Sequence, residues 1–170
     1  MGAPLINMER LLSGKELETL IHTIENRLGR KPTVLMAGEI GGANAFTPLL
    51  IAAKMGLPVL DADLIGRAFP ELQMNSCHLQ QHPATPAIVA DCFGNTVIID
   101  TTHIKTLENL ARGITVSMGS SAGIALHIMN GNEVSRAVIA GSLTKAIGIG
   151  QIIHKARKRR STHSCCSHEI

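Results

Sequence analysis

The sequence predicts an α/β fold, with a βαβ-type layered sheet in the N-terminal part and a smaller, β-rich α+β segment after it. Two apolar runs, residues 33–38 and 57–60, are bounded by glycine or proline, which is typical of buried strands. Residues 44–55 between them predict a helix. Further along the chain, two apolar runs flank a Phe93-Gly94-Asn95 turn, which is the pattern of a β-hairpin.

The first half of the chain contains further elements with clear boundaries. Ser13 and Glu16 have the spacing of a capping box, apolar residues follow at helical spacing, and Gly29 is a typical helix end. The two strands and the helix between them should form a right-handed, parallel βαβ unit. Residues 61–71 are too rich in polar residues, glycine and proline for a regular element, and residues 72–79 fit either a strand or a short helix.

The second half predicts a helix at 103–112, a β segment at 114–129 that glycine and serine interrupt, and a helix capped by Ser142. The polar end of the chain predicts disorder. We therefore expect three parts: an α/β domain that carries an acidic motif and is incomplete at its N-terminus, the start of a second β-rich domain that ends in a helix, and a disordered tail (1–100, 101–160 and 161–170).

The composition favours a cytoplasmic, soluble protein, and the acidic residues described below favour a small-molecule substrate. Of the 170 residues 45% are apolar, so one good core can form, but no apolar run is long enough to span a membrane. The first ten residues lack the plan of a signal peptide. Tryptophan and tyrosine are absent, which removes most platforms for base stacking and makes nucleic-acid binding an unfavoured function.

The basic character of the chain is concentrated near its end. Residues 155–160, KARKRR, hold five of the 16 Lys and Arg residues. This run fits a phosphate-binding or localisation segment, but a solvated helix end with cations at its C-terminal dipole is the favoured interpretation. Cys165 and Cys166 lie close to two histidines, yet no glycine or turn frames a zinc site there. The free thiol is the expected state of all four cysteines.

Polar residues follow both strands of the predicted βαβ unit. Glu39 ends the first strand, and Asp61 and Asp63 end the second. Because the carboxyl ends of parallel strands meet at one edge of a sheet, these acids should converge on one site. Gly41 and Gly42 form a turn that exposes backbone N–H groups at a helix start, which suits an anion or a carbonyl group of a substrate. Asn44 would either cap that helix or contact the same ligand.

Asp61 and Asp63 lie on the same side if the backbone between them is extended. Such a pair either shares a proton, as an acid/base pair, or shares a hard cation, so both are also candidate metal ligands. Arg67 offers a planar fork of donors to a carboxylate or imide-like group. Its alternative role is a structural ion pair with Asp63 or Glu71. The whole set predicts a catalytic site: Glu39, Asp61, Asp63, Arg67 and Glu71.

The histidines are weaker indications of a functional site than the acidic residues. Cys77-His78 and His82 could form a nucleophile pair or bind a metal, but no orienting acid has the right spacing, so a structural role is favoured. His127 lies in an apolar segment and is expected to be a hydrogen-bonded core histidine.

At the acidic motif the chain resembles the S-methyl-thiohydantoin desulfurase-like family, long carried as a domain of unknown function and often labelled hydantoinase-like. The resemblance lies in EIGGAN (39–44), in GLPVLDADLIGRAFPELQM (56–74), in ENLAR (108–112) and in GSLTKAIGIGQ (141–151). It covers roughly residues 1–157. Family members are normally about twice as long, so the chain resembles a partial-length member.

The resemblance implies hydrolysis at the C–S bond of an S-methyl thiohydantoin, or related chemistry on a hydantoin-like ring, with a divalent metal such as zinc as an implied cofactor. The substrate-binding residues would be Gly41, Gly42 and Asn44. A homo-oligomer or a partner chain is also expected. The competing hypothesis is a catalytically inactive fragment that serves as an interaction or oligomerisation module.

Overall fold

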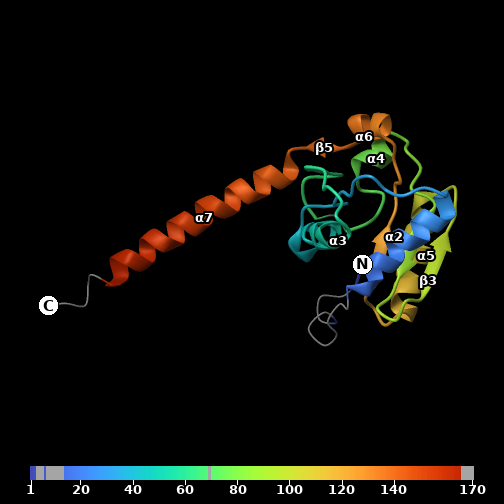
Figure 1. Ribbon diagram of the computed structural model, residues 1–170, viewed down its shortest axis with the longest axis horizontal. Coiled ribbons are helices and arrows are strands. Elements are labelled where there is room, and N and C mark those ends of the chain that lie inside the picture. Colours follow the sequence, from blue (N-terminus) through green and yellow to red (C-terminus); the bar gives the residue numbers. More distant parts are fainter. Residues whose placement is uncertain (3–5, 7–13, 69, 166–170) are drawn as a thin grey trace.

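The computed structural model describes residues 1–2, 6, 14–68 and 70–165, with side chains through residue 159 (Figure 1). Its helices are α2 (Lys15–Leu28), η1 (Gly42–Ala45, a 3-10 turn), α3 (Thr47–Met55), α4 (Ser76–Leu79), α5 (Ile104–Ser117), α6 (Gly131–Ala137) and α7 (Ser142–Cys165). Its strands are β1 (Ala62–Asp63), β2 (Ala87–Ala90), β3 (Thr96–Ile99), β4 (Gly123–Ala125) and β5 (Ile139–Ala140). This mixture confirms the α/β class.

A three-stranded antiparallel sheet with the order β3-β2-β4 forms the centre of the molecule. The predicted hairpin is confirmed, because β2 pairs with β3 across the turn that follows Asp91. β4 pairs with the other edge of β2, with Ile88 opposite Ala125. Strands from before and after α5 therefore share one sheet, and β2 lies in its middle.

The two faces of β2 pack against different helices. Successive side chains of a strand point to opposite faces. Ile88 and Ala90 pack with Leu20 and Ile24 of α2, whereas Ala87 and Val89 belong to a cluster that includes α5. All four residues of β2 are fully buried as a result. The core is thus a helix, a sheet and a second helix in layers.

The predicted parallel βαβ unit is present only as a single bridge. Leu35 and Val59 form a parallel bridge, in which Leu35 N–H donates to the carbonyl oxygen of Pro58 at 3.0 Å. The prediction of regular strands at 33–38 and 57–60 is therefore wrong in extent, although their parallel direction is correct. Pro32 and Pro58 lack the N–H groups that a longer ladder needs. The helix between the runs is confirmed as η1 and α3.

Several other boundaries differ from the prediction. α5 continues to Ser117, so the β segment predicted at 114–129 is wrong at its start and reduces to β4. Thr115 continues the buried i+4 row of Leu107 and Ala111, and this burial outweighs the β propensity of its branched side chain. Residues 76–79 form the short helix rather than a strand. Of the predicted capping box, Ser13 lies outside the described residues, and α2 begins after Gly14.

α7 extends away from the rest of the molecule as a single long helix (Figure 1). It runs to Cys165, and residues 166–170 lie outside the described part, so the disordered tail expected from residue 161 stays a prediction. No helix in the described part of the chain combines the length and apolar character that a membrane crossing needs.

Candidate functional site

Asp63 is the most constrained of the predicted site residues. It lies in β1, where it pairs with Ile139 of β5, and its side chain is fully buried. Its Oδ2 atom accepts N–H groups from Gly66 at 2.6 Å, Ile40 at 3.2 Å and Ile65 at 3.3 Å. Its Oδ1 atom has no hydrogen-bond partner among the described residues. Asp63 therefore fixes the turn at residue 40 to the loop at 65–66 and keeps one oxygen uncommitted.

The glycine turn lies directly against the loop that carries Arg67. A Cβ atom on Gly41 would lie 2.5 Å from the Cβ of Ala68, so only glycine allows this approach. Gly42 has a φ of +53°, in the left-handed region. Together with the Asp63 bonds, this contact brings three predicted components to one place: the turn, Asp63 and the segment next to Arg67.

Arg67 is exposed and its guanidinium group is largely uncommitted. Its Nε donates to the carbonyl oxygen of Ala68 at 3.3 Å. Among the described side chains, no ion pair joins Arg67 to Asp63 or Glu71. The structure thus contradicts the ion-pair alternative, and the terminal nitrogens of Arg67 are directed at no acid within the described part.

Asp61 serves a different purpose, since it caps α7. Its Oδ1 atom accepts the N–H groups of Leu143 and Thr144, each at 3.0 Å, and its Oδ2 atom accepts the Thr144 hydroxyl at 2.6 Å. The Thr144 hydroxyl bond, followed by the backbone bonds, lowers the pKa of Asp61 below its ordinary value. The sequence-derived cap for α7 was Ser142, whereas the structure shows this role for Asp61.

The structure does not support a shared cation or a shared proton between Asp61 and Asp63. Asp61 is exposed and directs both oxygens to α7, whereas Asp63 is buried and bonds to residues 40 and 65–66. The extended backbone on which the same-side prediction rested begins only at Ala62. Within the described residues no group of three or more His, Cys, Asp or Glu side chains could hold a metal ion. The residues present therefore do not fit the implied zinc.

The other two acids are bound to nearby amides. The Asn44 side-chain amide donates to the Glu39 carboxylate, and the Gln73 amide donates to Glu71. Asn44 makes no side-chain cap at the start of η1 or α3. Of the two roles predicted for Asn44, capping is thus wrong, and its contact orients Glu39 instead.

Sequence reasoning missed two residues that hold the loop around Glu71. Glu108 of α5 is buried, and its Oε2 accepts the N–H of Leu72 at 3.0 Å. Arg112, one turn later, pairs with Glu108 and donates to the carbonyl oxygen of Pro70 at 2.7 Å. The Glu-to-Arg spacing of four residues on a helix was the available signal.

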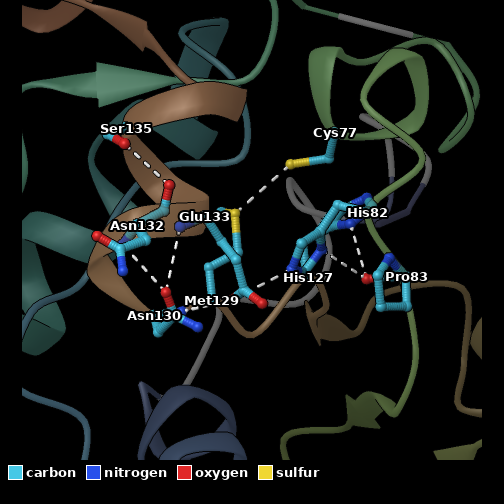
Figure 2. A network of polar contacts seen from close by, with 9 residues as sticks. All are labelled: Cys77, His82, Pro83, His127, Met129, Asn130, Asn132, Glu133 and Ser135. Carbon is cyan, nitrogen blue, oxygen red and sulfur yellow. Dashed lines mark hydrogen bonds and ion pairs between the residues drawn. The ribbon is translucent and has the colours of Figure 1, made fainter.

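A second polar cluster surrounds His127 (Figure 2). His127 is buried, and its Nδ1 lies 3.2 Å from the carbonyl oxygen of Pro83, while its Nε2 lies 3.2 Å from the Asn75 amide nitrogen. These contacts indicate a neutral ring with the proton on Nδ1. Burial, above all, lowers the pKa of His127 to about 4. The prediction of a hydrogen-bonded core histidine is confirmed.

Cys77 and His82 belong to the same cluster but do not form a nucleophile pair. The Cys77 Sγ lies 3.8 Å from the sulfur of Met129, and burial raises the pKa of its thiol to about 11. His82 bonds to the Pro83 carbonyl oxygen at 2.9 Å, and its Nε2 lies 3.5 Å from Glu133. A thiol with a raised pKa is a poor nucleophile, which supports the structural role expected for this region.

Two surface cavities lie elsewhere. One of about 820 Å³ is lined by His78, His82, His103, Lys105 and neighbouring residues, and one of about 430 Å³ lies between β3 and α5. None of the predicted site residues lines either cavity. The acidic motif is therefore an assembly of turns near the surface rather than part of these cavities.

Two family models match almost the whole chain. The N-terminal domain of the S-Me-THD-like family matches residues 1–101, and its C-terminal domain matches residues 102–168. The chain belongs to the S-Me-THD-like family. The recognition made from the acidic motif is thereby confirmed.

One solved structure resembles this S-Me-THD-like chain closely. The crystal structure of a protein from Chromobacterium violaceum has a TM-score of 0.81 and 30% sequence identity, over 92% of this chain and 45% of that protein. The chain thus spans less than half of the length of that relative. A search of curated proteins finds no match.

Proposed function

We propose that this chain carries out hydrolase-type chemistry on a small cyclic amide or thioamide, an S-methyl thiohydantoin or a hydantoin-like ring. Family membership supports the substrate class. The observation that supports the site is the contact between Gly41 and Ala68, because it places the glycine turn beside the arginine loop. This arrangement offers backbone N–H groups and a guanidinium fork to one ligand.

Each residue takes a role that its environment allows. Arg67 is exposed and would bind the ring oxygen or nitrogen through its terminal N–H groups. Glu39 lies two residues before Gly41, and Asn44 orients its carboxylate, so Glu39 would activate a water molecule. Asp63 is buried and acts as a positioning residue that holds the turn. Asp61 and Glu71 support the surrounding structure.

The reaction on an S-methyl thiohydantoin balances without a further reactant. Water adds to the ring carbon that bears the methylthio group, and a C–O bond forms. The C–S bond then breaks, methanethiol leaves with one proton of the water, the other proton stays on the neighbouring ring nitrogen, and the ring carbon becomes a carbonyl group. Arg67 would stabilise the negative charge that develops on the ring as water adds.

The test is to measure methanethiol release from an S-methyl thiohydantoin by the purified chain. Arg67→Gln and Glu39→Gln should each lower kcat/KM by about 100-fold or more, as removal of a charge-stabilising or proton-accepting group does. Arg27→Gln changes another exposed arginine, on α2, and should leave turnover unchanged. If the wild-type chain releases no methanethiol while a longer family member is active alongside, the proposal is wrong.

A further inference from the structure

α7 presents large apolar side chains to solvent. Figure 1 shows that this helix leaves the body of the molecule, and β1 is the one element of the described part that it contacts extensively. Ile147, Ile149, Ile152 and Ile153 are exposed to 53%, 51%, 69% and 47%. Four exposed isoleucines within seven residues form a surface that is typical of an interface.

One face of α7 has the spacing of a helix-pairing seam. Ala146, Ile149, Ile153 and Ala156 follow one another at intervals of three, four and three residues, which is the a/d pattern of paired helices. Apart from its chain neighbours and the backbone of its own helix, no atom of the described residues lies within 4 Å of a Cβ built on Gly150, which lies between the two isoleucines in sequence. A second helix can therefore approach this part of α7 closely.

The order of residues along this seam identifies its partner. The sequence Ala-Ile-Ile-Ala is the same from either end, with residue 151 at its centre. A second α7 that runs antiparallel therefore places Ala146 opposite Ala156 and Ile149 opposite Ile153. The two-fold symmetry forms each of these contacts two times. Such self-complementarity is what a two-fold symmetric interface requires.

Charge supports the antiparallel direction. About residue 151, positions 158 and 159 of one helix lie opposite positions 144 and 143 of the other. Lys158 and Arg159 of one copy thus come close to the carboxylate of Asp61 in the other, because Asp61 caps Leu143 and Thr144. A parallel pair would instead place two basic segments side by side.

We propose that α7 is the interface of a homodimer, in which two copies of this chain pair their α7 helices antiparallel about residue 151. The proposal is independent of the hydrolase chemistry, because its readout is the oligomeric state and not turnover.

Sedimentation velocity on the full 170-residue chain over a concentration series tests the proposal. We expect a monomer–dimer equilibrium, and Ile149→Asp or Ile153→Asp should raise its dissociation constant by about tenfold or more, since each buries a charge twice in the symmetric seam. Leu79→Asp is the matched control, because Leu79 is 81% exposed on α4 and should leave the dimer intact. Circular dichroism checks that each variant remains folded.

The direction of pairing has its own test. Replacing Lys158 and Arg159 by alanine should weaken an antiparallel dimer by about threefold, as the loss of exposed ion pairs does. A stronger dimer would indicate a parallel pair and contradict the proposed geometry. A chain that remains monomeric up to high micromolar concentration, or that binds only a different polypeptide through α7, would overturn the homodimer.

Discussion

Asp63 and His127 are both buried polar side chains, but their hydrogen-bonding states differ. Asp63 is 0% exposed and His127 is 4% exposed. Both ring nitrogens of His127 have a partner, whereas Asp63 uses only Oδ2 and leaves Oδ1 without one among the described residues. A buried group whose hydrogen bonds are all made stabilises the fold, because removing it leaves its partners unsatisfied.

The same difference separates the two regions around these residues. The His127 cluster joins α4, the loop before β2 and the segment before α6 through bonds that are already complete (Figure 2). The Asp63 region joins two turns and leaves an arginine without an acidic partner within the described part. Substitutions in the first region should therefore affect stability, and those in the second should affect ligand recognition.

The largest expected effect on stability is that of His127→Ala. The substitution removes the bonds to Asn75 and Pro83 and leaves a cavity, which together should lower the free energy of unfolding by about 3 to 4 kcal/mol. Urea denaturation measures it. His22→Ala, at a histidine that is 64% exposed on α2, should change the stability by less than about 0.5 kcal/mol. Equal effects of the two variants would contradict the structural role of His127.

The loss of stability that the wild-type chain shows on acidification should be slightly smaller than the loss caused by His127→Ala. The pKa of His127 is about 4 in the folded chain and 6.5 ordinarily. Between these values the unfolded chain binds a proton that the folded chain does not. The contribution of His127 to stability is therefore fully present above pH 6.5. The free energy of unfolding decreases by about 3 kcal/mol as the pH falls to 4.

Urea midpoints measured between pH 7 and pH 4 test this prediction. In His127→Ala the contribution of this histidine should be absent, and the decrease over the same range should be smaller. A variant that loses as much stability as the wild type over this range would show that another group causes the decrease.

Asp63→Asn should cost less stability than His127→Ala. The side-chain oxygen of asparagine can accept the same three N–H groups, and the amide nitrogen can occupy the position of Oδ1, which has no partner to lose. Because charge-assisted bonds become neutral ones, we expect a loss of about 1 kcal/mol in urea denaturation. A loss as large as that of His127→Ala would show that Asp63 is a structural group of the same kind.

The smallest expected effect concerns Asp61. In Asp61→Ala the first turn of α7 loses its cap, so the amide protons of Leu143 and Thr144 should exchange about threefold faster. Exchange at Leu107 in α5 should not change and serves as the control. Because the folded pKa of Asp61 is lowered, the cap is complete above its ordinary pKa and is lost as the pH falls through the folded value. Unchanged exchange at residues 143 and 144 would contradict the capping role.

Local signals in the sequence were sufficient for much of the fold. The hairpin follows from its turn, α2 from its periodicity and Gly29, and the parallel direction of residues 35 and 59 from the βαβ pattern. The extent of the parallel pairing did not follow, because it depends on which N–H groups find a partner in three dimensions. For the same reason the continuation of α5 was missed, since burial of Thr115 outweighs its propensity.

For the candidate site, the residue types could be predicted but their partners could not. The glycine turn and Arg67 do lie in neighbouring segments, as the motif suggested. The cap that Asp61 provides for α7 joins residues more than 80 positions apart in the chain, and no local pattern indicates it. Whether Glu39, Asp61, Asp63, Arg67 and Glu71 act on a substrate stays a prediction.

The central position of β2 has a consequence for the growing chain during synthesis. Its hairpin partner follows at once, with Ile88 opposite Ile98, but its other partner includes Ala125, which is made only after the whole of α5. Until then one edge of β2 has unpaired backbone groups. Until α5 forms, the sheet face that it covers is also exposed to solvent. A nascent chain that stops near residue 101 therefore exposes both an unpaired strand edge and an apolar surface. Both are prone to aggregation until residues 104–125 emerge and cover them.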